Sequence, residues 1–134
     1  MNKKKYTIAQ ILPALNTGGV ERGVVEISKS LIENDFKSIV ISSGGHMVSQ
    51  ITRNGGIHYE LDVHSKNPLR WSKIRNQLKI ILESENVDLI HFCSRAPAWI
   101  GVPLGAILDI PIITSVHMRF RKSNILKKYY KSIL

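Results

Sequence analysis

The sequence predicts an α/β fold: a Rossmann-like parallel sheet with helices on both faces. Two observations carry this prediction. Short runs rich in β-branched residues alternate along the chain with segments of helical periodicity, and glycine, proline or asparagine breakers separate them. Parallel strands need crossover connections, and a helix after each strand supplies them. The length of 134 residues suits a single domain.

The chain opens with a predicted strand at 6–12, which Pro13 closes. A helix follows at 20–33, because apolar residues recur there at three- and four-residue intervals. The second strand is expected at 37–43, where a β-branched run ends in a glycine pair.

A short helix is expected at 46–53, since an Asn-Gly-Gly breaker follows it, and a third strand at 57–63. Pro68 then begins a long helix that runs to Ser84. Its inner stripe is formed by apolar residues at helical spacing, namely Trp71, Ile74, Leu78, Ile81 and Leu82.

The fourth and fifth strands are predicted at 87–93 and 110–116, on either side of an apolar helix at 98–108. That helix lies in the almost wholly apolar stretch 96–116, which Asp109 and three prolines interrupt. We therefore expect it to be buried in the core and not to span a membrane. A basic amphipathic helix is expected within the final segment, 119–134.

The formal net charge of +9 is concentrated at the two ends of the chain. Residues 6–118 contain as many acidic as basic residues, whereas Lys3, Lys4 and Lys5 precede them and six further cations follow. A neutral body with basic ends is not the pattern of a domain that reads nucleic acid across one face, so no nucleic-acid partner is expected. The single cysteine, Cys93, excludes an intrachain disulfide and favours a reducing, cytoplasmic setting.

Polar residues and glycines follow each predicted strand at its carboxyl end. Parallel sheets bind ligands at that edge, so these residues are expected to converge on one site. They are Gly18, Gly19, Gly44, Gly45, Ser65, Lys66, Asn67, Ser94, Arg95 and His117.

Several common site chemistries do not fit this edge. Val20 breaks the G-x-G-x-x-G spacing of a dinucleotide site, and Val24-Val25 replace the Lys and Ser/Thr of a Walker A loop. The glycine pair can still present helix amides to a phosphate, or it can simply form a tight turn. No histidine pair has metal-ligand spacing, and Cys93 has no evident base, so neither a metal site nor covalent catalysis is predicted.

Five sequence blocks resemble the N-terminal half of a bacterial family 4 glycosyltransferase, of the kind that acts on lipopolysaccharide core or related envelope glycans. They occur in the family's order and cover essentially the whole chain. The blocks are NTGGVER at 16–22, SGGH at 43–46, KNP at 66–68, VDLIH at 87–91 leading into SRAPAW at 94–99, and TSVH at 114–117.

The resemblance implies one half of a GT-B fold: the acceptor-side domain, here 1–118, of a metal-independent, retaining enzyme. The donor would be a nucleotide sugar used as a co-substrate, with no separate cofactor. His117 would contact the transferred sugar as the catalytic candidate. The substrate-binding candidates are Gly18, Gly19, Arg22, Lys66, Ser94 and Arg95.

Two departures from the family pattern affect these expectations. Met118 stands where close relatives often have glycine, and the 134 residues do not include the family's donor-binding domain. The polypeptide is therefore expected to be a fragment or a split subunit that is inactive alone and is completed by a separate donor-binding chain. A non-catalytic domain that binds a glycan or lipid acceptor remains an alternative, as does an unrelated small-molecule-binding α/β protein. An anionic membrane surface is a further candidate partner, at the inner face of the cytoplasmic membrane.

Overall fold

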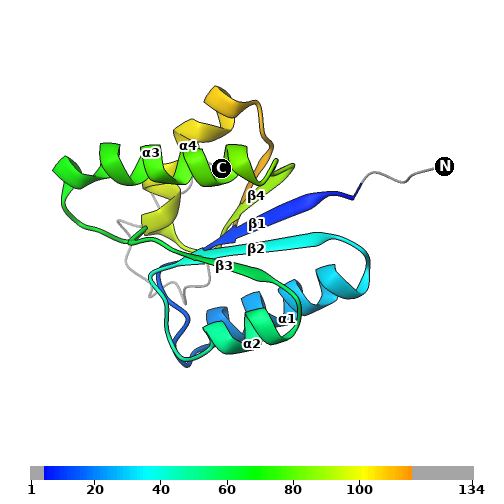
Figure 1. Cartoon of the computed structure of the whole chain (residues 1–134). Helices are drawn as coiled ribbons and strands as arrows, with labels where there is room; N and C mark the ends of the chain where they lie inside the picture. The colour runs from blue at the N-terminus through cyan, green and yellow to red at the C-terminus, as the bar shows by residue number, and fades with distance from the viewer. Residues whose placement is uncertain (1–4, 116–134) are drawn as a thin grey trace, which may run out of the picture.

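The computed structural model describes residues 5–115, in which five parallel strands form one sheet in the order β3-β2-β1-β4-β5 (Figure 1). The strands are β1 (Thr7–Ile11), β2 (Lys37–Ser42), β3 (Ile57–Glu60), β4 (Leu89–Phe92) and β5 (Ile112–Thr114). The helices of this part of the chain are α1 (Gly19–Glu33), α2 (Val48–Arg53), α3 (Pro68–Ser84) and α4 (Arg95–Leu108). The predicted Rossmann-like parallel sheet is confirmed.

The helices form a layer on each face of the sheet (Figure 1). On one face α1 contacts β2 and α2 contacts β3, while on the other α4 contacts β4 and β5 and packs against α3. The strand order places β1 at the centre, between β2 and β4, so the switch in strand order lies next to the start of α1. In open parallel sheets, ligands bind beside such a switch.

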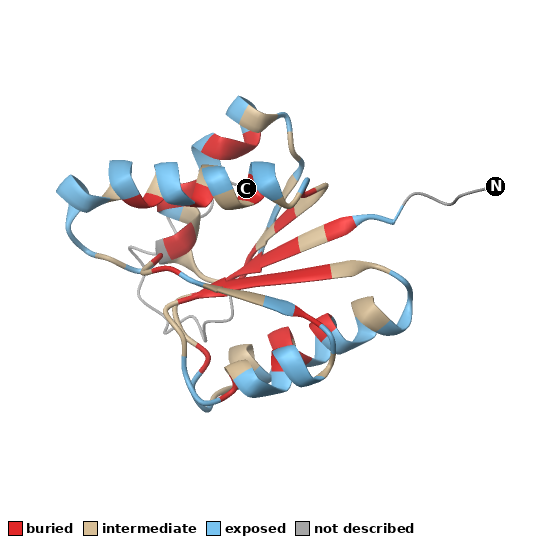
Figure 2. Cartoon of the chain, viewed as in Figure 1, coloured by how far each residue is buried: buried red, intermediate tan, exposed pale blue. Residues whose placement is uncertain are grey.

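Two hydrophobic clusters hold these layers together, one on each side of the sheet. Side chains alternate along a strand, so Ala9 and Ile11 face the α3–α4 layer while Leu12 and the β2 residue Val40 face α1 and α2. Figure 2 shows the buried residues concentrated in the strands and on the inward sides of the helices. The apolar stripe predicted for α3 is confirmed, since Ile74, Leu78 and Leu82 are buried.

All five strands are shorter than their sequence patterns indicate, and backbone hydrogen bonds explain the differences in β3 and β5. β3 ends at Glu60 instead of residue 63, because the Val63 amide donates to the Leu61 carbonyl and the chain turns away there. β5 begins at Ile112 instead of residue 110. The Ile110 amide is taken by the Gly105 carbonyl at the end of α4, and Pro111 has no amide to offer a strand partner.

α4 differs from its prediction in both length and burial. It begins at Arg95, three residues early, because a proline at 97 falls in the first turn, where backbone amides have no helical partner to lose. Gly101 and Gly105 let it approach the sheet closely: an added Cβ would collide with Phe92 and Ile112, respectively. The expectation that this helix is buried in the core holds for its inner side, where Ile100 and Leu104 are buried, but large apolar side chains on its outer side are exposed.

The four turns from helix to strand share one backbone conformation. Each contains a residue in the left-handed region, with φ between 50° and 94°: Asp35, Gly55, Asn86 and Asp109. A single left-handed residue lets a helix end and the chain reverse within a few positions. These short turns lie at the amino ends of the strands, so the carboxyl edge is left to the longer loops.

Three expectations fall outside the described residues. These are the catalytic candidate His117, the domain boundary at 118 and the basic amphipathic helix at 119–134. Between residues 5 and 115, no helix combines the length and hydrophobicity that crossing a bilayer requires.

Candidate functional site at the carboxyl edge of the sheet

The loops after β1 and β2 are joined at the carboxyl edge of the sheet. The Leu15 amide donates to the Gly44 carbonyl at 2.8 Å, and the Met47 amide donates to the Leu15 carbonyl at 2.9 Å. Gly45 has φ of 143°, and a Cβ there would overlap the Leu15 carbonyl, so this contact requires glycine. Thr17 and His46 add a side-chain hydrogen bond of 2.9 Å. We call this hydrogen-bonded contact between the two loops the joint.

The glycine pair at the start of α1 is not explained by backbone strain or crowding. Gly18 caps the helix in an extended conformation with φ of 174°, and Gly19 has no atom near the place of a Cβ. Only the flexible carboxylate of Glu21 lies against Gly18. A tight turn therefore does not demand these glycines, and neither glycine places a side chain of its own over the first amides of α1.

A cleft of about 420 Å³ opens where this loop meets the start of α2. Arg22, one of the predicted binding residues, lines it together with His46 from the neighbouring loop. The remaining lining residues are Thr17, Val25, Glu26, Met47 and Gln50. A cation and an imidazole beside a helix amino end form an environment suited to an anionic group.

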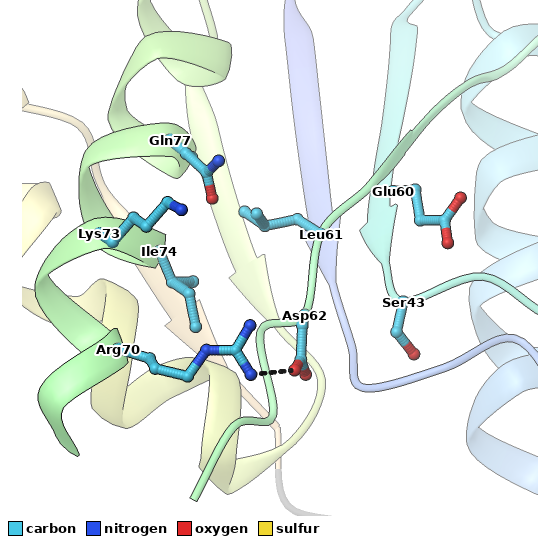
Figure 3. Close-up of a pocket in the computed structure, with 8 residues that line it drawn as sticks. All are labelled: Ser43, Glu60, Leu61, Asp62, Arg70, Lys73, Ile74 and Gln77. Atoms are coloured by element: carbon cyan, nitrogen blue, oxygen red, sulfur yellow. Dashed lines mark ion pairs between the residues drawn. The ribbon is translucent and has the colours of Figure 1, made fainter. Parts of the chain in front are cut away.

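A second cleft, of about 450 Å³, lies on the other side of the loop after β2, between that loop and α3 (Figure 3). In Figure 3 the side chains of Arg70 and Lys73 extend from α3 toward the segment that follows β3, which carries Asp62. The lining residues are Ser43, Glu60, Leu61, Asp62, Arg70, Lys73, Ile74 and Gln77.

The second cleft contains both charge signs, which only partly neutralise one another. Arg70 lies 4.0 Å from Asp62, which is also 3.1 Å from the ring of His64. Carboxylates accept hydrogen bonds from hydroxyl groups, and guanidinium, ammonium and amide groups donate them. Such a lining can orient a ligand that carries several hydroxyl groups, and the cationic side can hold an anionic substituent.

The structure places the sequence-predicted residues on one edge but in separate loops. Gly18, Gly19 and Arg22 lie together at the start of α1. Lys66 is exposed in the segment before α3, and Ser94 and Arg95 are half-buried at the start of α4, where Ser94 is the N-cap. His117 lies outside the described residues. Lys66, Ser94 and Arg95 line neither of the two clefts.

The sequence analysis missed the residues of the second cleft. Asp62 follows a strand at its carboxyl end, as the predicted residues do, but it sits two residues beyond Glu60 in a stretch interpreted as strand. Arg70 and Lys73 are three residues apart at the start of α3, a spacing that puts both on one side of a helix. This three-residue spacing is the feature of the sequence from which the two cations could have been predicted to lie together.

Two further observations limit the chemistry of the described part of the chain. Burial raises the pKa of the Cys93 thiol to about 12, so it is not a thiolate nucleophile near neutral pH. Residues 5–115 contain no cluster of three or more His, Cys, Asp or Glu side chains that could hold a metal ion.

Comparison with solved structures identifies glycosyltransferases that share this fold. A glycosyltransferase from Rickettsia africae ESF-5 is 37% identical, with a TM-score of 0.81, and the match covers 98% of this chain and 35% of that one. MurG from Acinetobacter baumannii is 16% identical with a TM-score of 0.64, over 81% of this chain and 34% of that one. The glycotransferase of kitacinnamycin is 13% identical with a TM-score of 0.58, over 84% and 30%. At such low identities the last two matches show the fold alone.

The chain spans about a third of the length of these solved proteins. No curated protein gives a significant match. A family model described as Glycosyltransferase Family 4 matches residues 17–134, which is most of the sequence. With this match and the 37% identity to the Rickettsia enzyme, the chain belongs to glycosyltransferase family 4.

Proposed function

We propose that this chain is the acceptor-side half of a retaining GT-B glycosyltransferase, which moves a sugar from a nucleotide-sugar donor to a lipopolysaccharide-type or other envelope glycan. The observation that carries the proposal is the family match over residues 17–134. The two clefts at the carboxyl edge support it, because they offer a region for an anion and a region for a polyhydroxyl ligand at the same edge of the sheet. The nucleotide sugar acts as a co-substrate, and no further cofactor is proposed.

We assign a role in binding or catalysis to each site residue that the sequence predicts. The amides of Gly18 and Gly19, with Arg22, face the phosphate groups of donor or acceptor, where a helix amino end favours negative charge. Lys66, Ser94 and Arg95 contribute donors around the acceptor. His117 contacts the transferred sugar. The second cleft, with Arg70, Lys73 and Asp62, is proposed as the place of the acceptor's sugar hydroxyls.

Catalysis in this proposal depends on charge stabilisation and positioning. The leaving diphosphate gains negative charge as the sugar bond breaks, so fixed donors that face it lower the barrier more than they strengthen ground-state binding. The groups that complete the donor site would come from the donor-binding half, in a longer chain or on a separate subunit. The 134-residue polypeptide alone is therefore expected to transfer no sugar.

A transfer assay tests the proposal with the polypeptide alone and with the donor-binding half supplied. Transfer should appear only in the second case. His117→Ala should then lower kcat by about 30- to 150-fold, which corresponds to about 2–3 kcal/mol of lost transition-state contact. Lys66→Ala and Arg95→Ala should mainly raise KM for the acceptor. Turnover by the pure polypeptide, or wild-type turnover in His117→Ala, contradicts these assignments.

A non-catalytic domain that binds the same acceptor is the second candidate, because the two clefts supply charge and hydrogen-bond contacts that suit binding without turnover. Acceptor binding without transfer, even with the donor-binding half present, would favour it. Membership of the family argues against the third expectation, an unrelated small-molecule-binding protein.

The proposal also includes peripheral association with the inner face of the cytoplasmic membrane. In the sequence of 119–134, apolar residues recur at helical spacing at Ile125, Tyr129 and Ile133, with Lys127, Lys128 and Lys131 between them and no acid. A helix of this composition can lie in the interface of an anionic bilayer, where a lipid-linked acceptor would also lie.

A further inference from the structure

A chain of hydrogen bonds runs from the edge strand β3 to the loop after β2. The ring Nε2 of His58 in β3 lies 2.7 Å from the Oγ of Ser42, the last residue of β2. The Gly44 amide donates to the same oxygen at 3.1 Å. Ser42 is fully buried, so water cannot supply another partner to its hydroxyl group, and His58 is half-buried beside it. The three groups therefore depend on one another for their hydrogen bonds.

The donors and acceptors in this chain of bonds determine the tautomer of His58. A backbone amide can only donate, so the Gly44 amide makes the Ser42 oxygen an acceptor. The hydroxyl hydrogen of Ser42 then needs an acceptor of its own. Within residues 5–115, the only other atom in hydrogen-bond contact with this hydroxyl group is Nε2 of His58. Nε2 must therefore be unprotonated, and the proton of the neutral ring lies on Nδ1.

The Gly44 turn that receives this bond belongs to the joint between the two site loops. Gly44 has φ of 98°, and its carbonyl accepts the hydrogen bond from the Leu15 amide. On either side of the turn, Ser43 lines the second cleft and His46 lines the first. A bond that fixes the Gly44 amide therefore helps to set the shape of both clefts.

A charged His58 cannot make the same set of bonds. Protonation places a hydrogen on Nε2, so the ring must donate to Ser42, and the buried hydroxyl hydrogen is left without an acceptor. A buried donor without a partner is destabilising, so we expect the arrangement of Ser42 and Gly44 to change. Burial lowers the pKa of His58 below its ordinary value of 6.5, which keeps the ring neutral at neutral pH.

The charged groups around His58 are few. Glu60 is two residues further along β3, on the same side of the strand, and its carboxylate opposes the effect of burial on the pKa of His58. The helix packed on β3 is α2, whose one ionisable side chain, Arg53, is in its last turn. The neighbouring strand β2 also has one, Lys37, which is paired with Glu85 at the amino edge. Glu60 is therefore the charge to alter in a test.

We propose that His58 is a positioning residue that acts through Ser42: its neutral ring holds the Gly44 turn in the shape that joins the site loops, and its charged ring releases that turn. The contribution of the neutral ring is complete above pH 6.5, and it is lost as the pH falls through the lower folded-state pKa of His58. Acidification therefore loosens the joint. The inference goes beyond the proposed function, because it concerns the shape of the loops whichever ligand the clefts bind.

Nuclear magnetic resonance of the isotope-labelled 134-residue chain tests the proposal without a ligand. At neutral pH, the ring nitrogen shifts of His58 should show Nε2 unprotonated and Nδ1 protonated. On titration, the Gly44 amide resonance should move together with the His58 ring, with one shared midpoint below pH 6.5. The protection factor of that amide against hydrogen exchange should fall about two- to tenfold, which corresponds to the loss of one net hydrogen bond.

Three variants test the separate steps. His58→Gln keeps an uncharged acceptor, so it should preserve the neutral-pH signals of Gly44 and abolish their pH dependence. Ser42→Ala should leave His58 titrating while the Gly44 amide no longer follows it. Glu60→Gln removes the carboxylate that favours the charged ring, so the shared midpoint should move to lower pH.

His64→Gln is the matched control. The His64 side chain is 47% exposed in the segment after β3, and its ring lies 3.1 Å from Asp62. Its replacement should leave the titration of the Gly44 amide unchanged. Thermal melts followed by circular dichroism check that this variant and the other three fold.

Three results would overturn the proposal. The first is a neutral His58 in the folded chain with its proton on Nε2. The second is a Gly44 amide that does not respond at the midpoint of His58, or that still follows it in Ser42→Ala. The third is a Gly44 titration that His64→Gln removes. None of these measurements uses sugar transfer, so a failure of the proposed function would leave their results unchanged.

Discussion

At the scale of single residues, a half-buried carboxylate at the amino edge of the sheet joins three elements. Glu85, whose side chain is 14% exposed, accepts a hydrogen bond from the Tyr59 hydroxyl of β3 and lies 2.6 Å from the Lys37 ammonium of β2. Lys37 first, then Tyr59, hold the pKa of Glu85 below its ordinary value of 4.5. The hydrogen bond to Glu85 raises the pKa of the Tyr59 hydroxyl.

Glu85→Gln should therefore destabilise the fold at neutral pH by about 1–2 kcal/mol, because charge-assisted hydrogen bonds become weaker neutral ones. A depressed folded-state pKa stabilises the protein fully above the unfolded value of 4.5. That contribution is lost as the pH falls through the lower folded-state value. Urea unfolding at neutral and acidic pH measures both effects, and the variant should lose less stability in acid than the wild type.

Glu83→Gln is the matched control for this prediction. Glu83 is 54% exposed and lies 4.0 Å from Lys79, so its removal should change the unfolding free energy by less than about 0.5 kcal/mol. Equal losses in the two variants would show that Glu85 is no more than a surface charge.

The candidate site illustrates how far single residues could be identified from the sequence. Gly18, Gly19 and Arg95 could be placed on the carboxyl edge because each follows a strand in a parallel sheet. Arg22 became a candidate only through the resemblance to the family. Asp62 was missed because β3 ends two residues before it, at a turn formed by one local hydrogen bond from Val63 to Leu61. Sequence patterns locate a strand but rarely its last residue.

At the scale of elements, the joint between the loops after β1 and β2 positions the site. Gly45→Ala should destabilise the chain by about 2–3 kcal/mol, because its φ of 143° is strained for alanine and the Cβ would overlap Leu15. Chemical denaturation measures the loss. In contrast, Gly23→Ala in α1 meets no atom within 4 Å and should stabilise the chain by about 0.5–1 kcal/mol. Destabilisation by both variants would disprove the role assigned to the joint.

The order and type of the helices and strands could be predicted from the sequence, whereas the exposure of the outer side of α4 could not. Pro68 and the helical spacing of apolar residues predicted the bounds of α3, Pro68 to Ser84, and the structure confirms them. The side chain of Asn67 caps its first turn. For α4, an uncharged apolar sequence predicted burial, and hydrophobicity cannot distinguish a core helix from one with an exposed apolar side. Only the close packing at Gly101 and Gly105 reveals which side faces the sheet.

At the scale of the whole molecule, the two edges of the sheet differ in construction. The amino edge has short turns and the Glu85 network, and the carboxyl edge has longer loops and two clefts. Binding residues on loops above a rigid sheet can vary without loss of the fold. A variant at the carboxyl edge can therefore lose the proposed sugar transfer and keep the fold.

The segment 119–134 allows a separate test of membrane association. Changing Lys127, Lys128 and Lys131 to glutamine should lower binding to anionic vesicles, since each lysine near such lipids contributes about 1 kcal/mol at most. Co-sedimentation measures it, at low and high salt. Unchanged binding in this variant would mean that the segment packs against protein and only its lysines face solvent.

The four left-handed turns have a practical consequence for handling the molecule. Asp35, Gly55, Asn86 and Asp109 all lie at the end of the sheet opposite the clefts. A dye, a biotin or an immobilising tag attached near Asp109, which is exposed, would therefore leave the opposite end open to solution. The turn itself must be kept, because a bulky or β-branched residue in its left-handed position would be strained. Surface-coupled binding measurements on this chain are best designed from that end.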